Sequence, residues 1–209
     1  MDSRVEPVRK KPRQKRSEET FDLILDTTAN LLEEFGLDKL NTNLICERAG
    51  LTPPALYRYF PNKYAILEEL GRRLMEAQNQ DVYRWFQVDG ADLRDALTIQ
   101  QILRGQYDVT CAQSGGQWIT RALHASPKLA DIRLRSHDQM VERLVKAQIN
   151  NTPNADEALL EEKFRITTET GYAILEMLND RPDLDVDQVL KETGKMIASV
   201  LKDIPFKSS

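Results

Sequence analysis

Short polar residues open two short helical segments between residues 41 and 60. Asn41 or Thr42 begins the first segment, and Thr52 begins the second. A hydroxyl or amide at such a position caps free backbone N–H groups, and the positive end of a helix attracts anionic oxygens such as those of phosphate. The chemistry that this spacing indicates is non-covalent binding of phosphate groups.

Motifs of the common enzyme classes are missing from the sequence. There is no Gly-rich phosphate loop and no nucleophile elbow. His124 and His137 lack a third ligand at a useful spacing, and Cys46 and Cys111 make neither a metal-ligand pair nor a disulfide framework. We expect both cysteines to be small, buried and reduced. The sequence therefore predicts a protein that is not an enzyme, with no catalytic residue, no metal and no cofactor.

Helical periodicity dominates the 209 residues, and no run alternates as a strand would. Glycine and proline separate the periodic segments because they stop helices. The predicted fold is all-α with about nine helices, three of them in an N-terminal helix-turn-helix domain. Their expected ranges are 17–36, 41–50, 52–61, 63–79, 92–112, 117–124, 127–150, 156–179 and 186–203.

Charge is distributed unevenly along the chain. Residues 1–16 carry seven basic and two acidic side chains, a net charge of +5, whereas the whole chain carries −4. Residues 17–63 hold four basic against eight acidic side chains. A basic arm on an acidic body attracts polyanions that the body repels. Since no stretch could span a membrane and residues 1–16 do not form a secretory signal, we expect a cytoplasmic protein.

The two short segments have the dimensions of a helix-turn-helix. Gly50 permits the tight turn between them, while Leu44, Ile45, Leu51 and Leu56 are spaced to pack the pair together. In such a unit the second helix enters the DNA major groove and the first lies across the backbone. Ser17 is placed to cap the helix that precedes the pair.

The same residues resemble the TetR family of bacterial regulators over about residues 17–75. The match runs Ile45-Cys46, Ala49-Gly50, Leu51-Thr52, Pro53-Pro54-Ala55, Leu56-Tyr57, Arg58, Tyr59-Phe60 and Lys63. Cys46 stands where the family usually has alanine, Tyr59 replaces the usual histidine, and Pro53-Pro54 is less common. Proline is well tolerated in a first helical turn, so the second helix should survive.

The resemblance implies a DNA site and gives roles to its residues. Side chains that hold the phosphate backbone would be Thr42, Thr52, Tyr57, Tyr59 and Lys63, and those that face base edges would be Asn43, Pro53, Pro54 and Ala55. Asparagine can pair with adenine, whereas proline and alanine can touch only apolar features such as the thymine methyl. Arg58 would reach a guanine or a phosphate.

For the rest of the chain the resemblance implies a dimer and a small-molecule pocket. Residues expected at the dimer interface are Thr168, Gly171, Tyr172, Leu175, Met196, Ile197 and Val200. Residues expected to line the pocket are Trp85, Tyr107, Cys111, Trp118, Arg121 and His124. The identity of the effector does not follow from the sequence.

These patterns predict three regions: a basic flexible arm (1–16), a helix-turn-helix DNA-binding domain (17–63) and a helical ligand-binding and dimerisation domain (64–209). The predicted function is a homodimeric repressor that binds a palindromic double-stranded DNA operator and is released by a small-molecule inducer, with no membrane partner. An activator, a repressor whose ligand promotes DNA binding, and an interaction module that has lost DNA binding are the alternatives.

Deleting residues 1–15 should weaken DNA binding and flatten its salt dependence. The arm holds most of the positive charge near the predicted helix-turn-helix. Each lost phosphate contact lowers the slope of the logarithm of the binding constant against the logarithm of the salt concentration by about 1. Titration of one operator at several salt concentrations measures both effects. Unchanged affinity together with an unchanged slope would show that the arm does not contact DNA.

Overall fold

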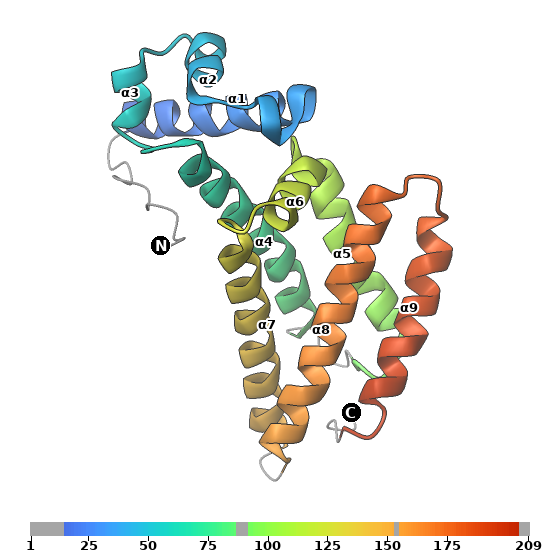
Figure 1. Ribbon diagram of the computed structural model, residues 1–209. Helices are drawn as coiled ribbons and strands as arrows, with labels where there is room; N and C mark the ends of the chain where they lie inside the picture. Colours follow the sequence, from blue (N-terminus) through green and yellow to red (C-terminus); the bar gives the residue numbers. More distant parts are fainter. Residues whose placement is uncertain (1–14, 87–91, 153–154, 205–209) are drawn as a thin grey trace. The chain divides into compact units, whose positions relative to one another are not determined.

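Helices make up the regular structure throughout the described part of the chain, residues 15–86, 92–152 and 155–204 of a computed structural model (Figure 1). In chain order they are α1 (Lys15–Lys39), α2 (Thr42–Ala49), α3 (Pro53–Tyr57), α4 (Lys63–Phe86), α5 (Ala96–Ala112), α6 (Gly116–Ala125), α7 (Ala130–Asn151), α8 (Glu157–Asp180) and α9 (Val186–Leu201). The predicted all-α fold is confirmed, and each of the nine expected segments corresponds to one of these helices. The basic arm lies almost wholly outside the described residues.

Local signals set several helix ends. Asn41 Oδ1 accepts a hydrogen bond from the Leu44 N–H at 3.0 Å and so caps α2. Gly50 closes α2 with φ of 65°, a left-handed conformation that glycine adopts without steric cost. Asp156 and Asp185 cap α8 and α9 in the same way as Asn41, since each side chain accepts from N–H groups of the first turn.

Two expectations about α1 need correction. Ser17 does not cap this helix, because the chain is already helical at Lys15; its hydroxyl pairs instead with the Tyr59 hydroxyl at 2.9 Å. Gly36 does interrupt the regular helix, with φ of 73°, but the helical assignment resumes and continues to Lys39.

The chain divides into two compact units. Of the described residues, unit 1 comprises 15–75 and 111–133, and unit 2 comprises 76–86, 92–110, 134–152 and 155–204. Helix α4 gives its first half to unit 1 and its second half to unit 2. The predicted domain boundary after residue 63 therefore lies inside unit 1, which also includes α6.

Unit 1 is built around α1, which packs against α2 and α6. Phe21 of α1 stacks on Phe60 with 4.8 Å between ring centroids. Gly115, just before α6, lies so close to α1 that a Cβ there would come within 2.7 Å of the Ala29 carbonyl oxygen. This close approach lets Ser114 donate a hydrogen bond to Asn30 Oδ1 at 2.7 Å.

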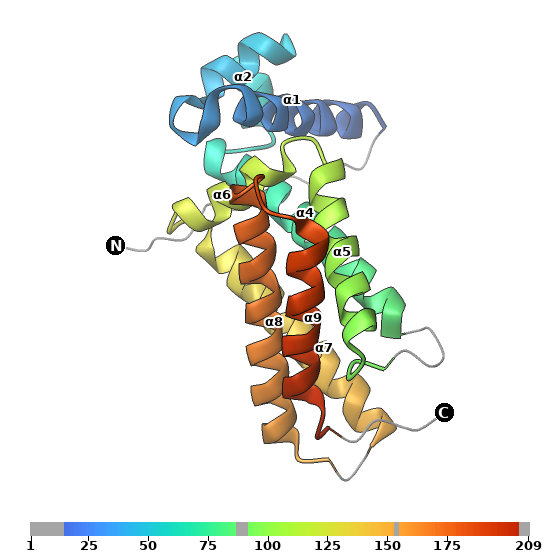
Figure 2. The same ribbon diagram turned by 90° about the vertical axis from the view of Figure 1, so that its right-hand side faces the viewer.

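Unit 2 contains most of α5 and α7 together with α8 and α9. Helices α8 and α9 run antiparallel side by side (Figure 2). Arg104 of α5 forms an ion pair with Asp187 of α9 at 2.5 Å, and the apolar faces of these helices form one buried core. No described helix is both long enough and apolar enough to cross a membrane.

Alanine substitutions at two glycines with left-handed backbone conformation should lower the free energy of unfolding by different amounts. Gly50→Ala should lower the free energy of unfolding by about 1 kcal/mol, because an L-residue is strained at φ of 65° but its Cβ meets no atom within 4 Å. Gly115→Ala has the same φ and adds the clash with Ala29, so its loss should be roughly 3 kcal/mol. Urea unfolding followed by circular dichroism measures both, and equal losses would contradict the close packing of α6 on α1.

Candidate nucleic-acid interface and ligand cavity

The α2–α3 pair forms a tight, turn-linked unit. After Gly50 the chain turns back, and the Leu51 N–H donates to the Cys46 carbonyl at 2.9 Å. Pro53 and Pro54 occupy the first turn of α3, where their missing N–H groups leave no hydrogen bond unmade. Ile45, Cys46 and Leu56 are buried and join the two helices to the core of unit 1. The sequence therefore folds here as the predicted helix-turn-helix.

Most of the residues predicted to contact DNA lie on the outside of this pair. Exposed side chains are Asn43, Thr52, Pro53, Pro54, Tyr57 and Arg58, and those of Thr42 and Ala55 are half-buried. The Thr42 and Tyr57 hydroxyls lie 3.0 Å apart and hydrogen-bond across the two helices. This contact places two hydroxyls next to each other at the surface, where both keep further hydrogen-bonding capacity.

Tyr59 and Lys63, the other two predicted phosphate ligands, lie deeper. Tyr59 is 5% exposed and packs edge-on against Phe21. The Lys63 ammonium donates to the carbonyl oxygens of Leu37 and Leu40 at 3.1 and 2.8 Å, just beyond the break in α1. Both side chains thus connect the end of α3 and the start of α4 to α1.

Two arginines supply the basic groups of the α2–α3 pair. Arg48 forms an ion pair with Glu34 at 2.9 Å, whereas the exposed Arg58 lies over the Tyr59 ring, 5.5 Å from its centroid, and pairs with no carboxylate of the described residues. Cys46 is buried as expected, and this burial raises the pKa of its thiol. Arg58 is therefore the basic group of the pair best placed to meet an external anion.

Comparison with known proteins identifies this region. A family model described as bacterial regulatory proteins, tetR family, matches residues 24–70. The α2–α3 pair lies within this matched segment. In Escherichia coli the tetracycline repressor protein class A from transposon 1721 is 38% identical over 52 residues, and the class C protein is 36% identical over 52 residues. The aligned segment spans about a quarter of this chain and of each of these relatives.

Solved structures share the fold of this chain over much more of its length. A structure from Syntrophomonas wolfei assigned to TetR-family regulators has a TM-score of 0.71 at 14% identity, covering 90% of this chain and 97% of that one. SmeT, the repressor of the Stenotrophomonas maltophilia multidrug efflux pump SmeDEF, has a TM-score of 0.65 at 19% identity, covering 90% and 91%. At these identities the likeness concerns the fold alone.

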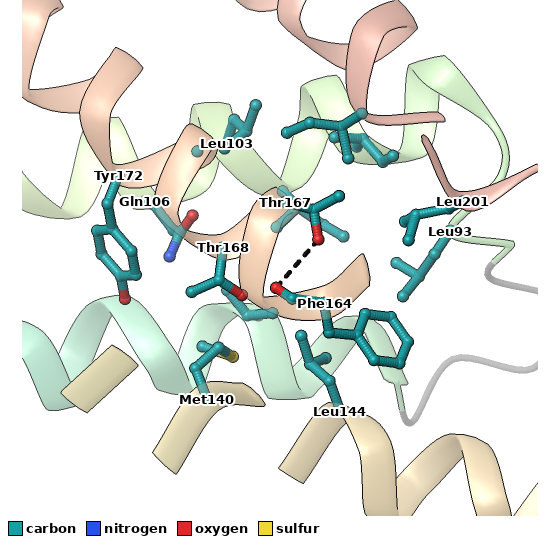
Figure 3. A pocket seen from close by; sticks show the side chains of 15 residues that line it. Leu93, Leu103, Gln106, Met140, Leu144, Phe164, Thr167, Thr168, Tyr172 and Leu201 are labelled. Carbon is teal, nitrogen blue, oxygen red and sulfur yellow. Dashed lines mark hydrogen bonds between the residues drawn. The ribbon is translucent and has the colours of Figure 1, made fainter. Parts of the chain in front are cut away.

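Unit 2 contains a small apolar cavity of about 80 Å³ (Figure 3). It is lined by Val82, Leu93, Ile99, Ile102, Leu103, Gln106, Met140, Leu144, Phe164, Thr167, Thr168, Gly171, Tyr172, Ile197 and Leu201. Pockets for drug-sized ligands are typically several times larger, about 300 Å³ or more. The cavity therefore holds only a small molecule in this conformation.

One end of the cavity borders a buried polar network. The Tyr172 hydroxyl donates to Asn79 Oδ1 at 2.5 Å, and Asn79 Nδ2 donates to Ser136 Oγ at 2.9 Å. Ser136 and Gln106 also hydrogen-bond to the Tyr172 hydroxyl, and the His137 ring stacks on the Tyr172 ring at 4.1 Å. Burial raises the pKa of Tyr172 well above its ordinary value, so its phenol stays neutral.

The six residues predicted to line a pocket lie elsewhere. Cys111, Trp118, Arg121 and His124 belong to unit 1, where Arg121 stacks over Trp118 at 4.8 Å. Trp85 and Tyr107 pack against the core of unit 2 without lining its cavity. Cys111 is exposed, contrary to expectation, because it lies in the last turn of α5. The prediction followed aromatic residues, whereas aliphatic side chains line most of the cavity.

Five of the seven residues predicted at a dimer interface point into unit 2. Thr168, Gly171, Tyr172 and Ile197 line the cavity, and Leu175 is buried in the core. Met196 is 49% exposed and Val200 is half-buried. Sequence reasoning selected one apolar stripe of α8, while Ile166 and Met177 on its other face are exposed.

Some site residues had a detectable signal that the prediction did not use. Gln106 shares the helical spacing of the buried residues Ile99, Ile102, Leu103 and Thr110, so it is a polar side chain on an apolar face. Ile166, Ala173 and Met177 recur at helical spacing on α8, which marks a second apolar face. Periodicity finds both faces but does not tell which one turns inward.

Proposed function

We propose that this chain is a transcriptional regulator that binds DNA through the α2–α3 pair. The observation that carries the proposal is the exposed polar surface of a helix-turn-helix within the segment that matches the tetR family model. Curated relatives of this segment are named repressors, which favours repression over activation. Operator binding as a homodimer and release by a small-molecule effector complete the proposal.

Each exposed residue of the pair has a role in this proposal. Thr42, Thr52 and Tyr57 bind phosphate oxygens and set the position of α3 without reading sequence. Asn43 and Arg58 supply hydrogen bonds, and the apolar surface at positions 53–55 meets thymine methyl groups. Tyr59 and Lys63 support these contacts from inside by fixing α3 and α4 on α1.

Selection of bound DNA from a random pool tests the proposal first. We expect a roughly palindromic consensus, because a two-fold dimer presents two α3 helices to two half-sites. On the selected operator, Tyr57→Ala and Arg58→Ala should each weaken binding about tenfold or more, since each removes a contact to phosphate or base. Fluorescence anisotropy with labelled operator measures the affinities.

Arg181→Ala is the matched control for Arg58→Ala. Arg181 is also exposed, lies in unit 2 and pairs only locally with Asp183, so its loss should leave operator affinity unchanged. If no DNA sequence is enriched, with or without candidate effectors, the alternative of a protein-interaction module that has lost DNA binding would be favoured. If the two arginine substitutions weakened operator binding equally, α3 would be rejected as the helix that contacts the DNA bases.

The dimer surface that we propose lies on the outer faces of α8 and α9. Ile166 and Met177 of α8 and Met196 of α9 are 47%, 36% and 49% exposed. The two helices lie side by side (Figure 2), so a second copy could bury both apolar faces together. Val200 borders this surface, while the inward residues Gly171 and Leu175 shape the packing behind it.

Met196→Glu should shift the chain from dimer to monomer. The substitution places a charge at the centre of a surface that has to be dry, and an unpaired buried charge costs several kcal/mol. Size-exclusion chromatography with light scattering gives the mass. Leu23→Glu is the control, because Leu23 is 43% exposed on α1 and belongs to unit 1, whereas the proposed surface belongs to unit 2. A dimer that survives Met196→Glu would place the interface elsewhere.

Effector control requires two states with different affinities for the effector. Helix α4 is the proposed link, since its residues 63–75 belong to unit 1 and its residues 76–86 to unit 2. Val82 of α4 lines the cavity and Asn79 joins the polar network beside it. A molecule that enlarges the cavity therefore acts directly on the part of α4 that lies in unit 2.

A further inference from the structure

The cavity of unit 2 has a polar end and an apolar end. Figure 3 shows Gln106, Thr168 and Tyr172 together at one end, and Leu93, Phe164 and Leu201 at the other. A ligand that fills the apolar end gains about 25 cal/mol for each Å² of apolar surface removed from water. The occupant is therefore mainly hydrocarbon, with its polar group toward Thr168.

The hydroxyls at the cavity differ in what they can still bind. Thr167 already donates to backbone carbonyls of its own helix, at 3.0 Å to Lys163 and 3.2 Å to Phe164. The Tyr172 hydroxyl donates its proton to Asn79 and accepts hydrogen bonds from Ser136 and Gln106. Thr168 forms no side-chain hydrogen bond with another described residue, so its hydroxyl can both donate to a ligand and accept from one.

Charge is absent from the lining. None of the described residues that line the cavity is an aspartate, glutamate, lysine, arginine or histidine. A carboxylate or ammonium placed there would lose its hydration without a counter-charge, which is among the most costly changes in a protein interior. The neutral phenol of Tyr172 provides no exception, since burial disfavours its ionised form.

We propose that this cavity binds a small, uncharged, mainly hydrocarbon molecule whose single hydroxyl or carbonyl group hydrogen-bonds to the Thr168 side chain. The volume of about 80 Å³ limits the unexpanded cavity to a short chain or a small ring. The ligand's regulatory role rests on the proposed function, whereas its chemical class rests on the lining alone.

Four probes with the same carbon number test the class: 1-hexanol, hexane, hexanoate and hexylammonium. We expect isothermal titration of the full chain to detect hexanol and hexane, and to give hexanoate and hexylammonium affinities at least about a hundredfold weaker than that of hexanol. Thr168→Val should weaken hexanol about fivefold and leave hexane unchanged, because only hexanol loses a hydrogen bond. Comparing the two ligands cancels any effect of the substitution on stability.

Thr167→Val is the matched control. It removes a hydroxyl from the neighbouring position of the same cavity, but this hydroxyl already serves the helix backbone, so hexanol affinity should stay within about twofold. Leu103→Phe, and Leu201→Phe if the first variant misfolds, should abolish binding of both neutral probes by filling the cavity. Circular dichroism confirms that each variant is folded.

Each outcome decides one part of the proposal. Hexanoate or hexylammonium binding as tightly as hexanol would overturn the uncharged class, and equal effects of Thr168→Val on hexanol and hexane would overturn the role of Thr168. Failure of every probe, or binding that survives both cavity-filling variants, would overturn the cavity as the site. If the expected pattern appears in a chain that selects no DNA, the ligand class stands and the proposed function fails.

Discussion

Packing on α1 is the constraint on which the DNA-binding proposal depends. Helices of eight and five residues, the lengths of α2 and α3, are too short to be stable in water by themselves, where about 12–15 residues are needed even for good helix formers. Ile45 and Leu56 are fully buried in unit 1, and Phe21 of α1 stacks on Phe60, three residues beyond the end of α3. The position of every exposed side chain on α3 follows from this buried contact.

Hydrogen bonds reinforce the same arrangement from the other side. Tyr59 reaches back to Ser17, and Lys63 reaches the carbonyls at the broken end of α1. A helix interrupted at Gly36 leaves such carbonyls without their normal partners, so a charged donor is well placed there. Tyr59 and Lys63, which the sequence analysis assigned to DNA phosphates, thus form contacts within unit 1. The side chains of Thr42, Tyr57 and Arg58 remain at the surface.

Unit 2 separates its polar groups from its apolar space. Asn79, Ser136 and Tyr172 satisfy one another, which avoids the cost of burying unpaired polar atoms. The cavity beside them retains one available hydroxyl, that of Thr168, against a lining that is otherwise mostly aliphatic. Because Asn79 and Val82 both belong to α4, the network and the cavity share a helix whose other half lies in unit 1.

The all-α class, the nine helical segments and the turn at Gly50 could be predicted from the amino-acid sequence, because helix periodicity, caps and breakers act over only a few residues. The sequence also located the α2–α3 pair, whose spacing is local. Contacts between distant parts of the chain decide which face of α8 turns inward, that Tyr59 is buried while Lys63 binds the carbonyls of Leu37 and Leu40, and which side chains line the cavity. These outcomes depend on contacts between residues far apart in the chain, and two apolar stripes on one helix look alike until a neighbouring helix covers one of them.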